Sequence, residues 1–487
     1  MLKNKIINNL SFILLIVFFL NLLLEALIVG GRWDLSEQIA FSQRLIEGIN
    51  SYANGQTDLF YPSSPYFPGV GYLSFIYSTI GFDNIYLNEI LMLTTAVLTG
   101  VLYSIMLQKL TFKLYPNISK TVIFAFTVIL FATCFRTYFV YMREFKPDTI
   151  ILLLGLISFF LLKENKKPSF MYLCIVGLIL FVATFFKQSS FIIFILVYIL
   201  IFYNLLLSFK EKSLIFSSYF LVGLLSLHFV FKTDNLYYFT IDVISQHPVS
   251  DINSILSSFT ASFVYNIIIW ISIVYFFFKK YNQFALKSLE TIYLIFGIIW
   301  FVFSLLSTMK LGGNRGNIEV GLLVFIPFVI FALNDIFKKF FKNIFFNYSV
   351  VIILIVCITR YSYGIITNTI NYGIKLNEDR VSIDFLKKEF LGKNVFVDGN
   401  TYIVSKASGL NVLTEAETVG HFNNIPNYDM SKLKNAIDNK LYDLFILKDD
   451  LSYFKDIKIK NKIDHNYKIY ENENLPNQLK GKILILK

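Results

Sequence analysis

The chain has 487 residues, of which 55% are hydrophobic and 53 are Phe. Soluble globular domains are not built this way, and repeated apolar runs of roughly 20 residues indicate transmembrane helices. The net charge of +11 does not point to nucleic acid, because most lysines lie in short clusters between the apolar runs. The three cysteines all lie in apolar runs and offer neither a disulfide framework nor metal-ligand spacing.

The chain begins with MLKNKIINNL and an apolar run that lacks a small-residue cleavage site, so we expect an uncleaved signal anchor. The loop 31–85 follows. In it, Asp34 can cap a helix that ends at Gly48, and Glu37 then lies on the same face as Asp34. The later run YPSSPYFPG holds too many prolines to continue a helix. A carboxylate so close to the bilayer edge is costly unless it is paired or functional.

The apolar runs predict eleven membrane spans, which makes the chain an all-α polytopic membrane protein. The fourth span is short for a bilayer core of about 30 Å and is expected to be tilted or buried. The predicted spans are 10–30, 86–108, 121–142, 148–162, 169–186, 190–208, 214–231, 258–278, 288–308, 319–334 and 344–366.

The distribution of lysine predicts the orientation. With the N-terminus in the cytoplasm, sixteen lysines fall in inner segments and eight Lys or Arg residues in outer ones. An odd number of spans then places the C-terminal region outside, and the compartment expected is the bacterial inner membrane. The outer cations are Arg32, Arg44, Arg143, Lys146, Lys187, Lys232, Lys310 and Arg315.

The outer cations lie beside polar clusters at helix ends. In YMREFKPDTI, Glu144, Lys146 and Asp148 crowd one turn, and Pro147 can open the next helix. Asp148 then lies at a helix N-terminus, where the dipole favours an anion. The alternative role for Asp148 is a simple helix cap.

Two further outer turns also place cations beside polar residues at helix ends. FFKQSS holds Lys187 and Gln188 at the outer surface, where the alternative for Lys187 is snorkelling toward water. KLGGNRGNIE brings three glycines together with Lys310, Arg315 and Asn317 just before a helix. Exposed backbone N–H groups there can cradle a phosphate, although an ordinary glycine-rich turn remains the alternative.

A few polar residues lie deeper in the apolar runs. Glu89 and Arg136 fall inside the second and third spans and should face the bundle interior, in a structural pair or against a ligand. His228 and His247 have no neighbours at metal-ligand spacing and are treated as structural.

The composition changes after about residue 370. Residues 376–487 are polar, with short apolar runs. VSIDFLKKEFLG reads as an amphipathic helix, NVFVDG as a strand, and SKLKNAIDNKLYDLFILKDD as a helix followed by a strand. We therefore expect a small α/β domain outside the membrane, joined to a membrane domain of residues 1–370.

These motifs, in this order, resemble the GT-C fold glycosyltransferases, such as the protein mannosyltransferases and the lipid A aminoarabinose transferases. The likeness rests on the first-loop acid, the Tyr/Pro-rich segment after it, the KPD turn, the KQ turn and the Gly/Asn turn. It implies a polyprenyl-phosphate-linked sugar as donor and transfer on the outer face of the membrane. The first-loop acid of such enzymes is a base or a metal ligand, and Asp34 is the match here. Many members have two adjacent acids at that place, whereas this chain has Asp34 followed by Leu35.

The chemistry of this reaction suits the same residues. An inverting transfer needs a base for the acceptor and positive charge for the departing phosphate. Asp34 and Asp148 are the candidate base, or the ligands of a divalent cation such as Mg²⁺ or Mn²⁺. The acceptor can be a lipid, a glycan or a protein. The candidate substrate-binding residues are Glu37, Arg44, Tyr61, Tyr66, Glu144, Lys146, Lys187, Gln188, Arg315 and Asn317.

Two other classes of function fit less well. A transporter or flippase of lipid-linked sugars should carry polar residues near mid-bilayer, broken helices and inverted repeats. Here the polar clusters gather at one surface. A non-catalytic scaffold needs only one or two spans to anchor it.

Overall fold

The computed structural model of the chain divides into two compact units. Unit 1 comprises residues 1–24, 94–227 and 249–368, and unit 2 comprises residues 25–93, 228–248 and 369–487. The structure describes residues 2–29, 39, 41–42, 45–46, 68–81, 85–134, 147–163, 167–232, 237, 245–246, 248–285, 288–310, 315–340, 343–397, 404, 409–415, 430–447 and 457–487.

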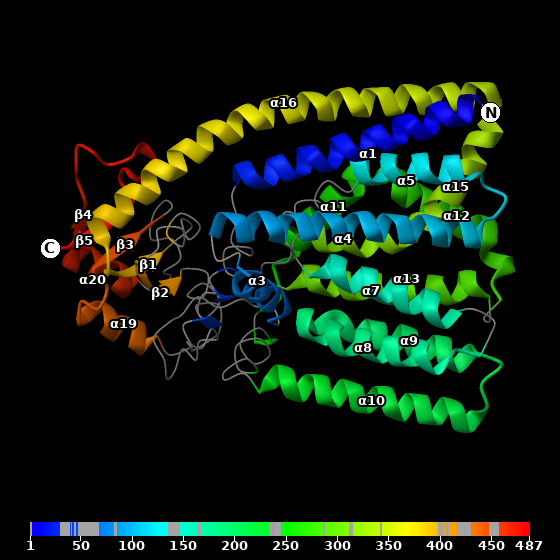
Figure 1. Ribbon diagram of the computed structural model, residues 1–487, viewed down its shortest axis with the longest axis horizontal. Coiled ribbons are helices and arrows are strands. Elements are labelled where there is room, and N and C mark those ends of the chain that lie inside the picture. Colours follow the sequence, from blue (N-terminus) through cyan, green and yellow to red (C-terminus); the bar gives the residue numbers. More distant parts are fainter. Residues whose placement is uncertain are drawn as a thin grey trace. The chain divides into compact units, whose positions relative to one another are not determined.

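Unit 1 is a bundle of helices (Figure 1). Its buried apolar side chains form a continuous hydrophobic core. The first and last helices, α4 and α10 continue into unit 2. The helices are α1 (Leu2–Val29), α4 (Ile85–Leu114), α5 (Lys120–Cys134), α7 (Asp148–Lys163), α8 (Phe170–Phe186), α9 (Phe191–Tyr203), α10 (Phe209–Phe231), α11 (Ile252–Tyr265), α12 (Ile267–Lys280), α13 (Leu289–Met309), α14 (Arg315–Leu322), α15 (Ile326–Phe340) and α16 (Asn343–Phe390).

Each predicted span falls on one or more of these helices, so the expected class of a polytopic α-helical membrane protein is confirmed. Within the described residues, six helical stretches are long and apolar enough to cross a membrane, and the bent pair α11 and α12 makes a seventh. α5, α7, α8 and α9 are apolar but shorter, with 17 residues or fewer. An α-helix rises about 1.5 Å per residue, so these four are shorter than a bilayer core.

Two of the predicted elements differ in the structure. The span predicted at 258–278 is wrong as a single helix, because the chain bends by 82° between α11 and α12. Asn266 occupies the break with φ −117° and ψ 26°, outside the helical region. Conversely, α16 continues without a break from the last span to Phe390, and no proline interrupts its 48 residues.

Aromatic contacts establish which ends of the helices of unit 1 lie together. Phe191, the first residue of α9, packs against Phe303 near the end of α13, with ring centroids 4.7 Å apart. Phe159 near the end of α7 packs against Tyr293 near the start of α13, at 5.4 Å. α13 therefore runs antiparallel to α7 and α9. We call the end where α7 and α9 begin and α8 and α13 finish the Asp148 end.

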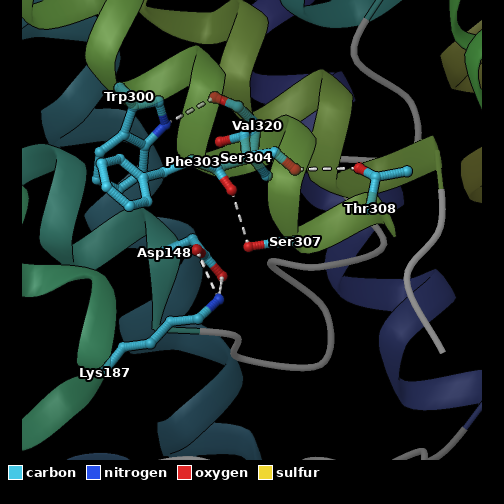
Figure 2. Close-up of polar contacts among 8 residues, drawn as sticks. All are labelled: Asp148, Lys187, Trp300, Phe303, Ser304, Ser307, Thr308 and Val320. Atoms are coloured by element: carbon cyan, nitrogen blue, oxygen red, sulfur yellow. Dashed lines mark hydrogen bonds and ion pairs between the residues drawn. The ribbon is translucent and has the colours of Figure 1, made fainter. Parts of the chain in front are cut away.

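Close packing fixes α14 against α13. A Cβ atom on Gly321 would lie only 2.8 Å from the Cβ of Ser304, so the two helices approach more closely than a larger residue allows. The indole Nε1 of Trp300 donates to the carbonyl of Val320 at 3.2 Å (Figure 2). Trp300 is almost fully buried, so this bond lies inside the contact between α13 and α14.

The opposite end of unit 1 is joined by side-chain bonds among four elements. Tyr115, just after α4, donates its hydroxyl to Glu290 of α13 at 2.7 Å, and Lys280 of α12 lies 3.6 Å from the other oxygen of Glu290. Burial, and then the Glu290 carboxylate, raise the pKa of Tyr115. On the neighbouring helices, Tyr275 donates to Asp335 of α15. These contacts hold the lysine-rich helix ends in place.

Unit 2 contains the α/β domain predicted after residue 376. Its five-stranded sheet has the order β2-β1-β3-β5-β4, with β1 parallel to β2 and β3, and β5 antiparallel to β3 and β4. The strands predicted in NVFVDG and KLYDLFILKDD correspond to β1 and β3, so both predictions are confirmed. The elements are β1 (Asn394–Val397), β2 (Asn411–Glu415), α19 (Ser431–Asp438), β3 (Leu444–Ile446), α20 (Ile457–Asn466), β4 (Tyr467–Ile469) and β5 (Ile483–Leu486).

A second part of unit 2 contains α3 (Gly69–Thr79), which begins directly after the proline-rich run. Ser74 of α3 lies 3.0 Å from the hydroxyl of Ser42 and 3.0 Å from the side-chain oxygen of Asn88. The amide of Asn88 donates to the carbonyl of Ser74 at 3.0 Å. Glu89 is buried, as expected for an acid inside a span. These polar contacts tie α3 to the start of α4.

Candidate functional site

Asp148 and Lys187 form an ion pair at the Asp148 end of unit 1 (Figure 2). The Nζ atom of Lys187 donates to both carboxylate oxygens of Asp148, at 2.8 Å each. The helix α7 begins at Asp148, one residue later than predicted. Pro147 precedes it, and its carbonyl accepts from the N–H of Ile151 at 3.1 Å. Lys187 has extended backbone between α8 and the short helix η1 (Gln188–Ser190). The sequence predicted each residue separately but not their pairing.

The pair is partly shielded from water. The side chain of Lys187 is 19% exposed and that of Asp148 is 13% exposed. Shielding strengthens the attraction relative to a surface ion pair, and the N-terminus of α7 adds a favourable dipole for the carboxylate. The ammonium of Lys187 is therefore held in a defined position, which a freely snorkelling lysine would not be.

Arg315 is the first residue of α14, directly after the glycine-rich turn. Its Nε atom lies 3.4 Å from Oε1 of Glu319, one helical turn further on. Its guanidinium lies over the ring of Tyr265, with Cζ 4.3 Å from the ring centroid. A cation above an aromatic face is attracted by the ring quadrupole. Asn317, between Arg315 and Glu319, is half-buried.

Sequence reasoning missed Glu319 and Asn266. Glu319 is 1% exposed, and Asn266 is fully buried. The side-chain amide of Asn266 donates to Oε1 of Glu319 at 3.3 Å and to the carbonyl of Ser262 at 3.1 Å. The available signals were an acid four residues after an arginine and a lone Asn between two apolar runs.

The turn before α11 is attached to the end of α13. Val249 forms a β-bridge with Lys310, and the N–H of Ser250 donates to the carbonyl of Met309 at 2.9 Å. Asp251 caps α11 by accepting from the N–H of Ser254 at 3.0 Å, and the bonds from Ser254 lower its pKa. Because α13 finishes at the Asp148 end, Lys310 belongs to the same end of the bundle as Asp148 and Lys187.

The described residues do not form a metal site. They contain no group of three or more His, Cys, Asp or Glu that could hold a metal ion. Both oxygens of Asp148 accept from Lys187.

Several predicted site residues lie outside the described residues. They are Asp34, Glu37, Arg44, Tyr61, Tyr66, Arg136, Glu144, Lys146 and His247, and the side chain of Gln188 belongs with them. His228 of α10 is described and is exposed.

Comparison with known proteins identifies the fold. No protein-family model matches the chain, and no curated protein matches it by sequence. The structure of ArnT from Cupriavidus metallidurans bound to undecaprenyl phosphate is similar over 98% of this chain and 97% of that chain, with a TM-score of 0.58 and 10% identity. The archaeal oligosaccharyltransferase AglB from Archaeoglobus fulgidus, in complex with an inhibitory peptide and a dolichol-phosphate, is similar over 89% of this chain and 69% of that chain. Its TM-score is 0.54 at 9% identity. The chain therefore has the GT-C fold that its motifs predicted.

Proposed function

We propose that this protein is a membrane glycosyltransferase that moves a sugar from a polyprenyl-phosphate donor to an acceptor on the outer face of the membrane. The observation that carries the proposal is a likeness of fold over nearly the whole length to ArnT, whose structure holds undecaprenyl phosphate. The cationic side chains of Lys187 and Lys310 at one end of the bundle add support. A departing phosphate needs such charge.

The proposed reaction is a single displacement with inversion. An oxygen or nitrogen of the acceptor attacks the anomeric carbon, the bond from that carbon to the phosphate oxygen breaks, and the polyprenyl phosphate leaves with the bonding electrons. Asp34 takes the proton of the acceptor as general base. Lys187 and Arg315 stabilise the negative charge that develops on the phosphate.

The contact between Asp148 and Lys187 favours a specific division of roles. Both oxygens of Asp148 already accept from the ammonium of Lys187, at 2.8 Å each. We assign Asp148 to holding Lys187 toward the phosphate, and we leave the role of base to Asp34.

The remaining predicted residues complete the proposed substrate site. Tyr61 and Tyr66 would stack on the sugar or guide the lipid. Polar side chains would bind the sugar, the phosphate or the acceptor, which is a lipid, a glycan or a protein. These residues are Glu37, Arg44, Glu144, Lys146, Gln188 and Asn317.

One observation favours a second candidate function. The bend of 82° between α11 and α12 resembles the broken helices of transporters, which line substrate sites near mid-bilayer. A flippase for lipid-linked sugars would use such a break. A flippase moves the intact donor and forms no new glycosidic bond, so product analysis separates the two functions.

Substitution of Asp34 tests the proposal. Asp34→Asn keeps the volume and much of the capping ability, so protein level in the membrane should be unchanged. Sugar transfer should fall about 10²–10⁴-fold, the loss typical of a missing acid–base group. The assay is transfer in membranes, normalised to protein level, with Glu37→Gln and Asp148→Asn in parallel. An Asp34→Asn rate above about half of wild type, far outside that range, would exclude Asp34 as the base.

A further inference from the structure

We propose that Glu319, held by Asn266, is a positioning residue that directs the guanidinium of Arg315 toward the phosphate of the lipid donor. This inference rests on the proposed function, because it names the residues that place one cation of the phosphate site. Glu319 is the last residue of the stretch KLGGNRGNIE but was given no role from the sequence, and Asn266 belongs to none of the motifs that indicated function.

Asn266, Glu319 and Arg315 form a chain of contacts that begins at a buried amide and ends at a half-buried guanidinium. Asn266 donates to Oε1 of Glu319 at 3.3 Å, and the same oxygen lies 3.4 Å from Nε of Arg315. The side chain of Glu319 is 2% exposed and that of Arg315 is 32% exposed. A guanidinium is a planar fork whose donors point to more than one side. A buried carboxylate at Nε therefore fixes the plane of the group and leaves its charge near the surface of the bundle.

The carboxylate itself has little freedom to move. α14 carries Glu319, and the close contact at Gly321 together with the bond from Trp300 to Val320 fixes α14 on α13. Tyr265 at the end of α11 lies against the guanidinium at 4.3 Å. Arg315 is thus held between two helices, as a site that must recognise one oriented anion requires.

Asn266 is poorly explained by packing alone. Its side-chain oxygen and the hydroxyl of Ser262 are buried without a hydrogen-bond partner among the described residues. Buried polar atoms without partners are rare in native proteins and call for an explanation. A hydrophobic side chain would be more stable at this buried position between α11 and α12. The bond from the amide to Glu319 explains why an asparagine is present there.

The proposal and the simplest alternative predict opposite signs. If Glu319 only neutralises Arg315, removing its charge takes a negative neighbour away from the arginine and strengthens the binding of an anion. If Glu319 positions Arg315, removing it releases the guanidinium and weakens the binding of an anion, even though a negative charge has been lost. The sign of the change therefore decides between the two roles.

The test measures binding of undecaprenyl phosphate to the purified full-length protein in detergent, without any sugar transfer. Arg315→Ala should raise the Kd about tenfold, as loss of a charge-assisted contact does. Glu319→Ala should also raise the Kd, by about three- to tenfold, and Glu319→Gln should restore part of the loss because its carbonyl can still accept from Nε. The double variant Glu319→Ala/Arg315→Ala should bind no more weakly than Arg315→Ala, since both changes remove one contact.

Asn266→Leu provides a second variant that leaves both charges in place and should raise the Kd in the same direction as Glu319→Ala. It keeps the proposal testable if Glu319→Ala fails to give a monodisperse protein. If Glu319→Ala binds undecaprenyl phosphate as tightly as wild type or more tightly, the positioning role is overturned. If only Asn266→Leu folds, the same result in that variant overturns it. Normal binding in Arg315→Ala would overturn it as well. If the wild-type protein does not bind undecaprenyl phosphate, the proposed function fails and this inference fails with it.

Discussion

The ion pair of Asp148 and Lys187 is the part of the site whose energy can be worked out from the structure. At a separation of 2.8 Å, two unit charges attract by about 6 kcal/mol at an effective dielectric constant of about 20, before any cost of desolvation. Exposed pairs retain about 0–1 kcal/mol of such energy, and removing one partner of a buried pair costs about 3–5 kcal/mol. With 19% and 13% of the side chains exposed, we expect a coupling energy of about 2 kcal/mol.

A double-mutant cycle measures this coupling. Asp148→Asn, Lys187→Met and the double variant are compared by unfolding in mixed detergent micelles. Each single variant should be less stable than wild type, and the double variant should be more stable than the sum of the two losses predicts. Losses that add to within about 0.5 kcal/mol would show that the side chains do not interact. The exchanged pair Asp148→Lys/Lys187→Asp is a control that should recover part of the stability.

The same variants separate two roles of Asp148 in catalysis. If Asp148 acts by holding Lys187 toward the phosphate, Asp148→Asn should lower kcat/KM no more than Lys187→Met does, and the double variant should lower it no further. If Asp148 is the base, kcat should fall about 10²–10⁴-fold with little change in KM. A loss in Asp148→Asn far larger than the loss in Lys187→Met would refute the assignment of Asp148 as a positioning residue.

Two further predictions concern the bundle and its orientation. Gly321→Ala places a Cβ 2.8 Å from the Cβ of Ser304, so thermal unfolding should show a loss of about 1–3 kcal/mol, and normal stability would contradict the close packing of α14 on α13. In intact cells, an impermeant thiol reagent should label cysteines placed at Ser51 and Ser452 but not one at Asn165, because the lysine distribution places the first two outside. Labelling at Asn165 alone would reverse the orientation.

The helices of the bundle could be predicted from the sequence because each apolar run must be buried or face lipid. The residues at which each helix begins and ends were harder to predict, since an apolar run can continue through a bend in the chain. The run 258–278 contains one Asn among apolar residues, and nothing local specifies that the chain turns by 82° there. The contact of Asn266 with Glu319 depends on a helix 53 positions further on.

The candidate site could be predicted only as a set of separate clusters. Asp148 and Lys187 are 39 positions apart, and their pairing depends on the antiparallel packing of α7 and α8. Glu319 follows the glycine-rich turn in an apolar stretch, where its pattern is that of an ordinary i,i+4 helix pair with Arg315. Charge and spacing indicated which residue types matter, and the tertiary structure determined which of them meet.

The most direct test of the central claim follows the sugar itself. Membranes that contain the protein are incubated with a panel of radiolabelled polyprenyl-phosphate sugars, and the label is traced to lipid, glycan and protein fractions. Our account predicts that label from one donor moves into an acceptor through a new glycosidic bond, and that membranes with the Asp34→Asn variant lack this product. Label that stays on its polyprenyl carrier with every donor, or a carrier that crosses the bilayer intact, would contradict a glycosyltransferase and favour a transporter.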